Sequence, residues 1–168
     1  MLSRSRSWMV LGGCDGKDCI KAIIKKGNIW EPYIIDVLKK YIRKGDHVID
    51  VGAHIGTISL AMSNLVGNTG MVHSFEAELQ FFRELYYNIY LNARTNIMPY
   101  LVWLGNKNEA IENAKNIFIR YPNYSSVCKE VINPWTRQHR TLDSFEFENI
   151  KLIKIDIEWT ENEFLERG

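Results

Sequence analysis

Acidic residues and glycines stand together where a strand is expected to run into a helix. Asp50, Gly52 and Gly56 lie in the run HVIDVGAHIGTISL, which begins as a β-branched apolar strand and ends as the start of a helix. Glycines at such a turn let the backbone take left-handed conformations and let a ligand approach it closely. The pattern is typical of a nucleotide-binding turn. Its structural alternative is a tight turn in which Asp50 caps local amides.

The positions of the glycines distinguish between classes of nucleotide. A dinucleotide-binding turn needs glycine at its first, third and sixth places. Here those places hold Gly52, His54 and Thr57. The lysine followed by serine or threonine that marks a phosphate-binding loop is also absent. We therefore expect a phosphate-free adenosyl ligand, with His54 and Thr57 beside it.

Further acids follow two later strands. Glu76 comes directly after the strand predicted over 71–75, where a carboxylate can accept hydrogen bonds from both ribose hydroxyls. Asp156 and Glu158 fall at the end of the strand predicted over 152–157, and side chains two apart on a strand point to the same side. Because the carboxyl ends of parallel strands face the binding crevice, we expect all three beside a ligand. The alternatives are helix-start acids and a salt bridge for Asp156.

The elements that carry these residues alternate between strand and helix. Apolar runs predict strands over 48–51, 71–75, 97–104 and 152–157, and helical spacing of apolar residues predicts helices over 32–42 and from about residue 79 onward. This alternation indicates an α/β fold with a mainly parallel sheet. Residues 1–29 are interpreted as an N-terminal extension or short hairpin outside the core.

In order and spacing these motifs resemble the FkbM family of S-adenosylmethionine-dependent methyltransferases. The matching segments are WEP at 30–32, VIDVGAHIGTISL, VHSFEA, the Leu104-Gly105 pair, TLDSF at 141–145 and IKIDIE. The resemblance implies a Rossmann-like, doubly wound fold of the class I methyltransferase type over residues 30–168. It also implies S-adenosyl-L-methionine as the methyl donor and O-methylation of a hydroxyl on a sugar or other small metabolite.

The resemblance assigns roles to individual residues. The turn from Gly52 to Gly56 would hold the methionine end of the donor, Glu76 the ribose, and residues 102–104 the adenine. Of Asp156 and Glu158, the catalytic candidates, one would deprotonate the acceptor hydroxyl or bind a metal, although we assign no metal site. The full set expected to bind the donor is Glu31, Asp50, Gly52, His54, Gly56, Thr57, Glu76, Trp103 and Asp156.

Two other functions stay open at this stage. The chain has fewer predicted strands than a complete domain of this class, so we expect the C-terminal strands to be missing. Either the chain is a fragment or truncated product, or its exposed sheet edge pairs with another chain, such as a second copy. Trp159 stands where the family usually has glycine. Both features favour a truncated, non-catalytic binding or interaction module. The other alternative is an NAD-dependent oxidoreductase, which shares the turn and the ribose acid.

Composition sets expectations about partners and compartment. The chain has 21 basic and 20 acidic side chains and a formal charge of +1. That balance gives no overall attraction to nucleic acid, so we predict a small-molecule or sugar acceptor and no nucleic-acid partner. The apolar run near the N-terminus is too short for a membrane span, so we expect no membrane partner. Three cysteines without metal-ligand spacing favour a reduced, cytoplasmic setting.

Overall fold

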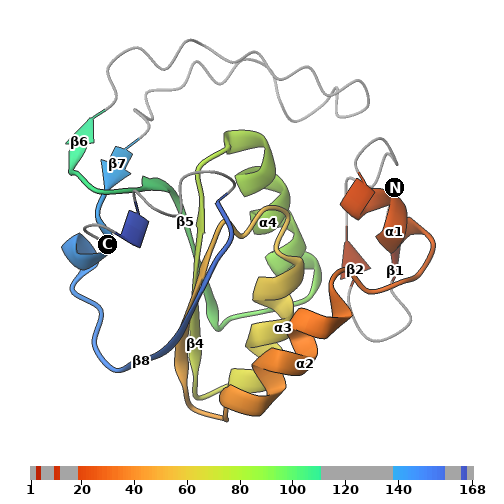
Figure 1. Ribbon diagram of the computed structural model, residues 1–168. Coiled ribbons are helices and arrows are strands. Elements are labelled where there is room, and N and C mark those ends of the chain that lie inside the picture. The colour runs from red at the N-terminus through yellow and green to blue at the C-terminus, as the bar shows by residue number, and fades with distance from the viewer. Residues whose placement is uncertain (1–2, 5–9, 12–18, 111–137, 158–163, 166–168) are drawn as a thin grey trace.

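Within the described residues, six strands form one mainly parallel sheet in the order β6-β7-β5-β4-β3-β8 (Figure 1). The computed structural model describes residues 3–4, 10–11, 19–110, 138–157 and 164–165. All neighbours from β7 to β8 are parallel, and β6 runs antiparallel to β7. The strands are β3 (His47–Val51), β4 (Met71–Glu76), β5 (Ile97–Leu104), β6 (Glu109–Ala110), β7 (Gln138–Arg140) and β8 (Ile150–Ile155).

The order of the strands determines where a ligand can bind. From β3 the chain adds β4, β5 and β7 on one side, and then returns to place β8 on the other side of β3. Asp50 of β3 thereby pairs with Lys154 of β8. In open α/β sheets the crevice for a ligand lies beyond the carboxyl ends of the strands at this reversal. The predicted Rossmann-like α/β arrangement is confirmed.

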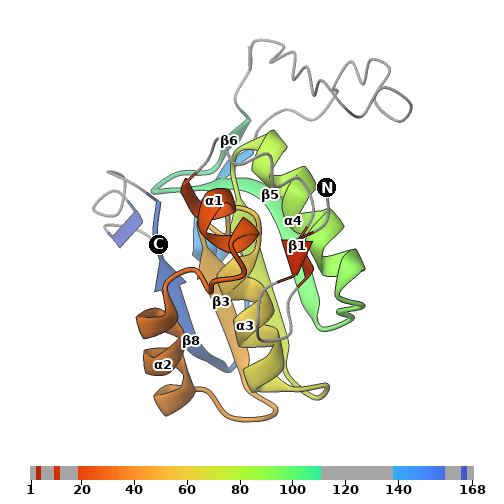
Figure 2. The same cartoon turned by 90° about the vertical axis from the view of Figure 1, so that its right-hand side faces the viewer.

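Three helices cover one face of the sheet (Figures 1 and 2). They are α2 (Pro32–Tyr41), α3 (Thr57–Val66) and α4 (Leu79–Leu91). Val48 and Val72 of the central strands are fully buried against this layer, and Leu85 of α4 joins the same cluster. This apolar layer holds α3 and α4 against the sheet, so that short turns connect β3 to α3 and β4 to α4.

Aromatic rings cover the other face of the sheet. Phe75 of β4 stacks on Tyr100 of β5 with ring centroids 4.6 Å apart and an interplanar angle of 11°. Phe145, at the end of the short 3-10 helix η1 (Leu142–Phe145), meets the Phe75 ring edge-on at 5.0 Å. Ile49 and Val51 of β3 belong to the same cluster. β3 therefore contributes to both layers, as its continuous apolar run predicts.

The N-terminal region differs from the interpretation given above. β1 (Ser3–Arg4) pairs with β2 (Val10–Leu11) as an antiparallel hairpin, but α1 (Cys19–Lys25) packs into the main core. Ile24 is 2% exposed, and Lys21 Nζ lies 2.7 Å from Glu84 Oε1 of α4. Placing all of residues 1–29 outside the core was therefore wrong, because a short helix rich in lysine gives little periodicity to detect.

A membrane-spanning helix is not found in the described part of the chain, since none there is both long and apolar enough to cross a bilayer.

Candidate functional site

A pocket of about 630 Å³ lies at the carboxyl ends of the central strands. It brings together five of the residues predicted to bind the donor, namely Gly52, His54, Glu76, Trp103 and Asp156. Among the residues that the structure describes, the lining is formed by Ile20, Val51, Gly52, His54, Phe75, Glu76, Ala77, Glu78, Phe81, Val102, Trp103, Leu104, Asp156 and Ile157. The turns after β3, β4 and β8 and the end of β5 thus meet at one site.

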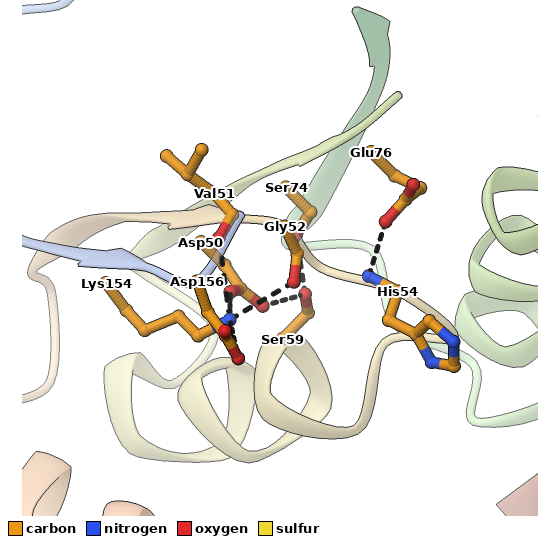
Figure 3. Close-up of polar contacts among 9 residues, drawn as sticks. All are labelled: Asp50, Val51, Gly52, His54, Ser59, Ser74, Glu76, Lys154 and Asp156. Atoms are coloured by element: carbon orange, nitrogen blue, oxygen red, sulfur yellow. Dashed lines mark hydrogen bonds and ion pairs between the residues drawn. The ribbon is translucent and has the colours of Figure 1, made fainter. Parts of the chain in front are cut away.

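Glu76 presents an oriented carboxylate to this pocket. Its Oε2 accepts a hydrogen bond from the backbone N–H of His54 at 2.8 Å (Figure 3). Its Oε1 accepts one from the N–H of Glu78 at 2.7 Å. Burial raises the pKa of Glu76, and the two backbone hydrogen bonds oppose that shift. Each oxygen keeps a further lone pair, so the group can accept hydrogen bonds from a diol.

The two glycines of the turn are required by the packing of the protein itself. Gly52 has φ of 75°, and a Cβ there would stand 1.8 Å from the backbone oxygen of Asp156. Gly56 has φ of 91°, and a Cβ there would stand 2.6 Å from Leu85 Cδ1. The close approach that the sequence predicted is therefore an approach to β8 and α4. Neither Gly56 nor the buried Thr57 at the start of α3 lines the pocket.

Asp50 lies beneath the turn and outside the pocket lining. Its side chain is fully buried, and Oδ2 accepts a hydrogen bond from Ser59 Oγ of α3 at 2.6 Å. Ser74 Oγ of β4 in turn donates to Ser59 Oγ at 2.9 Å. This chain of hydrogen bonds ties β3, β4 and α3 together. Asp50 thus accepts from a side-chain hydroxyl of α3, where the alternative interpretation expected local amides, and its part in ligand binding stays a prediction.

Lys154 is a charged residue beside the site that the sequence analysis did not assign to it. Its Nζ lies 3.2 Å from Asp50 Oδ1 and 3.6 Å from Asp156 Oδ2, and it donates to the carbonyl of Gly52 at 3.1 Å (Figure 3). Burial alone would lower the pKa of Lys154, but the negative charges of Asp50 and Asp156 outweigh it and raise the pKa. The available signal was its position two residues before Asp156, on the same side of the strand.

The remaining predicted residues occupy varied positions. Glu31 precedes α2 with φ of 44° and accepts a hydrogen bond from the Tyr33 hydroxyl at 3.1 Å; it does not line the pocket. The His54 ring lies against the Phe81 ring, with centroids 3.9 Å apart. Trp103 is 37% exposed at the end of β5. Glu158 and Trp159 lie outside the described residues.

The lining carries a negative charge. Glu76, Glu78 and Asp156 contribute three carboxyl groups, and the part of the lining formed by described residues includes neither lysine nor arginine. Phe75, Val102 and Leu104 supply apolar walls. S-adenosylmethionine fits such a set, because it combines an apolar adenine and a ribose diol with a sulfonium, an ammonium group and a single carboxylate, and therefore has a net positive charge and no phosphate. A pyrophosphate would instead meet like charge.

A comparison of sequences settles the family. Residues 50–168 match the methyltransferase FkbM domain. The chain belongs to the FkbM methyltransferase family. This confirms the predicted S-adenosylmethionine-dependent, Rossmann-like methyltransferase domain and its cofactor. An NAD-dependent oxidoreductase is no longer supported.

Individual relatives of this FkbM domain match over shorter stretches. The fibrillarin-like rRNA/tRNA 2′-O-methyltransferase of Pyrobaculum calidifontis is 34% identical over 80 residues, which are 43% of this chain and 34% of that protein. The protein of the same name from Pyrobaculum aerophilum is 32% identical over the same shares. The chain thus spans about a third of the length of these curated relatives.

Solved structures of methyltransferases match part of this chain. A putative rRNA methylase from Clostridium thermocellum is 21% identical with a TM-score of 0.40, over 42% of this chain and 40% of that one. Aeropyrum pernix fibrillarin, solved with S-adenosyl-L-methionine bound, is 26% identical with a TM-score of 0.36, over 42% and 31%.

The exclusion of a nucleic-acid partner was wrong. The names of the Pyrobaculum relatives give rRNA and tRNA as what those proteins act on. That prediction used the net charge of the whole chain, which does not show how charge is distributed over the surface. Although the formal charge is only +1, Lys39, Lys40, Arg43 and Lys44 are all exposed within a stretch of six residues at the end of α2.

Proposed function

We propose that this FkbM domain transfers a methyl group from S-adenosylmethionine to a sugar hydroxyl. The observation that carries the proposal is the pairing, in one pocket, of an oriented Glu76 carboxylate at the end of β4 with Asp156 at the end of β8. In this assignment Glu76 holds the ribose hydroxyls, and the backbone from Gly52 to His54 faces the methionine end. Val102 to Leu104 form the wall for the adenine.

The reaction requires the protein mainly to align the two reactants and to remove a proton from the acceptor. When bound, the donor supplies an electrophilic methyl carbon on a sulfonium. The acceptor oxygen forms its bond to that carbon as the carbon–sulfur bond breaks, and the proton of the hydroxyl must leave. We assign that proton to Asp156, which lines the pocket and has 57% of its side chain exposed. Glu158 stays a second candidate for the same role.

Two acceptors share this chemistry, and the relatives favour one of them. A ribose 2′-hydroxyl in RNA and a hydroxyl on a free sugar both present a neutral oxygen that needs a base. The names of the Pyrobaculum relatives favour the ribose of RNA as the first acceptor to test. The FkbM resemblance favours sugar metabolites, which therefore form the second arm of the test.

The proposal is tested first by donor binding. Calorimetric titration of the purified chain with S-adenosylmethionine should give saturable binding, and Glu76→Gln should weaken it by roughly tenfold, since a hydrogen bond to a charged group is lost. Glu148→Gln is the matched control, because Glu148 is exposed just before β8, away from the carboxyl ends of the strands. A folded chain that does not bind the donor would overturn the proposal.

Transfer is measured next, with donor labelled in the methyl group. One arm offers total RNA and the other a panel of sugars and glycosides. Label that enters RNA and protects the neighbouring linkage from alkaline cleavage identifies a 2′-hydroxyl, whereas label that enters only the panel identifies a metabolite. Donor binding without transfer in either arm would support the alternative of a non-catalytic module.

A further inference from the structure

One buried ammonium group joins the two strands that border the site. Lys154 Nζ of β8 donates to the carbonyl of Gly52 at 3.1 Å and to that of Val51 at 3.4 Å, both at the end of β3. The same nitrogen lies 3.2 Å from Asp50 Oδ1 and 3.6 Å from Asp156 Oδ2. The Lys154 side chain is 14% exposed. Four oxygens from two strands thus surround a single cation.

The contacts exceed what neutralising Asp50 requires. A buried lysine is tolerated when one carboxylate compensates its charge, and Asp50 alone would supply that. Lys154 also holds two carbonyl groups of the turn and reaches the exposed carboxylate of Asp156. Of these partners, Val51, Gly52 and Asp156 line the pocket, whereas Asp50 and Lys154 itself do not.

We propose that Lys154 is a positioning residue for the methionine end of the methyl donor. Its ammonium group holds the carbonyl groups of Val51 and Gly52 and the Asp156 carboxylate, so that the backbone assigned to the methionine end of the donor and the carboxylate assigned to the acceptor keep a fixed relation. The inference rests on the proposed function, because it assigns this end of the pocket to the methionine portion. Lys154 acts through these groups and makes no contact with the donor.

A purely structural role predicts a different pattern of effects. If Lys154 only compensates the buried charge of Asp50, then Lys154→Met destabilises the fold, and the double variant Lys154→Met with Asp50→Asn restores both stability and ligand binding. If Lys154 positions the methionine end, the double variant regains stability but not affinity for ligands that carry that end. The double variant also keeps the test valid where Lys154→Met alone does not fold.

The decisive experiment compares two ligands by calorimetry. S-adenosylhomocysteine carries the amino-acid end, whereas 5′-methylthioadenosine has the same adenosine and a thioether but no amino acid. In the double variant we expect roughly tenfold weaker binding of S-adenosylhomocysteine and binding of 5′-methylthioadenosine within about twofold of wild type. Lys154→Arg, which keeps the charge, should recover part of the loss.

Each outcome separates the inference from the proposed function. Equal weakening of both ligands, or no weakening of either, would overturn the role of Lys154 while leaving the donor site in place. Recovery of S-adenosylhomocysteine affinity in the double variant would overturn it as well, in favour of charge compensation alone. A folded wild-type chain that binds neither ligand would instead refute the proposed function, on which the inference depends.

Discussion

Replacing Gly52 by alanine tests whether the turn after β3 is shaped by the protein or by its ligand. The residue has φ of 75°, and non-glycine residues in such a conformation cost about 1–3 kcal/mol. A Cβ would also stand 1.8 Å from the backbone oxygen of Asp156, so the end of β8 must move away. That movement breaks the hydrogen bond from Asp156 N–H to the Val51 carbonyl, now 3.1 Å long, at about 0.5–1.5 kcal/mol.

We therefore expect Gly52→Ala to lower the free energy of unfolding by roughly 2–4 kcal/mol. Gly45→Ala is the matched control. Gly45 has φ of 89°, but a Cβ there would meet Thr69 Oγ1 at an ordinary 3.6 Å, so only the backbone strain applies. The difference between the two variants isolates the approach of β8 to β3.

Urea unfolding of both variants, followed by circular dichroism with the m-value monitored, measures this difference. Equal losses in the two variants would refute the reasoning, because they would mean that β8 does not constrain Gly52. A Gly52→Ala chain of unchanged stability that had lost donor binding would show that the glycine serves the ligand, as the sequence alone suggested.

Three further predictions follow from ionisable groups. Because burial raises the pKa of Glu76, donor affinity should fall as the pH drops through that raised value, and calorimetry across pH should show no such fall in Glu76→Gln. Burial lowers the pKa of His73 from 6.5 to about 4, and the charge of His47 adds to this shift. The contribution of His73 to stability is therefore complete above pH 6.5 and is lost as the pH falls through about 4. Urea midpoints should therefore decline with acidity less steeply in His73→Phe, and equal slopes would contradict this. Lys21→Met should lower the free energy of unfolding by about 3–5 kcal/mol, because it leaves the Glu84 carboxylate buried without its cation. In denaturant titrations, the double variant Lys21→Met with Glu84→Leu should recover most of that stability. No recovery would show that the pair does more than balance charge.

The strands and their terminal acids could be predicted because their signals are local. The prediction for β5 matches the structure from Ile97 to Leu104, since that apolar run is closed by Gly105 and Asn106. Glu76 and Asp156 were placed at the pocket by a rule of geometry, that parallel strands bring their carboxyl ends to one edge. Neither inference needed knowledge of which strands are neighbours.

The contacts that depend on strand pairing could not be predicted. Lys154 became part of the site only when the structure placed β8 beside β3 and aligned Lys154 with Asp50. The same pairing explains why position 52 holds glycine, since a Cβ there would meet the backbone oxygen of Asp156, and the contact of Gly52 with a ligand stays a prediction. Nothing in the spacing of these residues reveals the register, because β3 and β8 are separated by most of the chain.

The predicted preference for a ligand without phosphate has a different physical basis in the structure. The absence of glycine at two of the three places predicts that a pyrophosphate cannot closely approach the backbone of the turn. In the structure the backbone N–H of His54, which could have bound an anion, already donates to Glu76 at 2.8 Å. The carboxyl groups of Glu78 and Asp156 add like charge to the lining. The His54 N–H is therefore not available to a phosphate, and the carboxyl groups of the lining repel one. The same negative charge favours a cationic ligand such as a sulfonium.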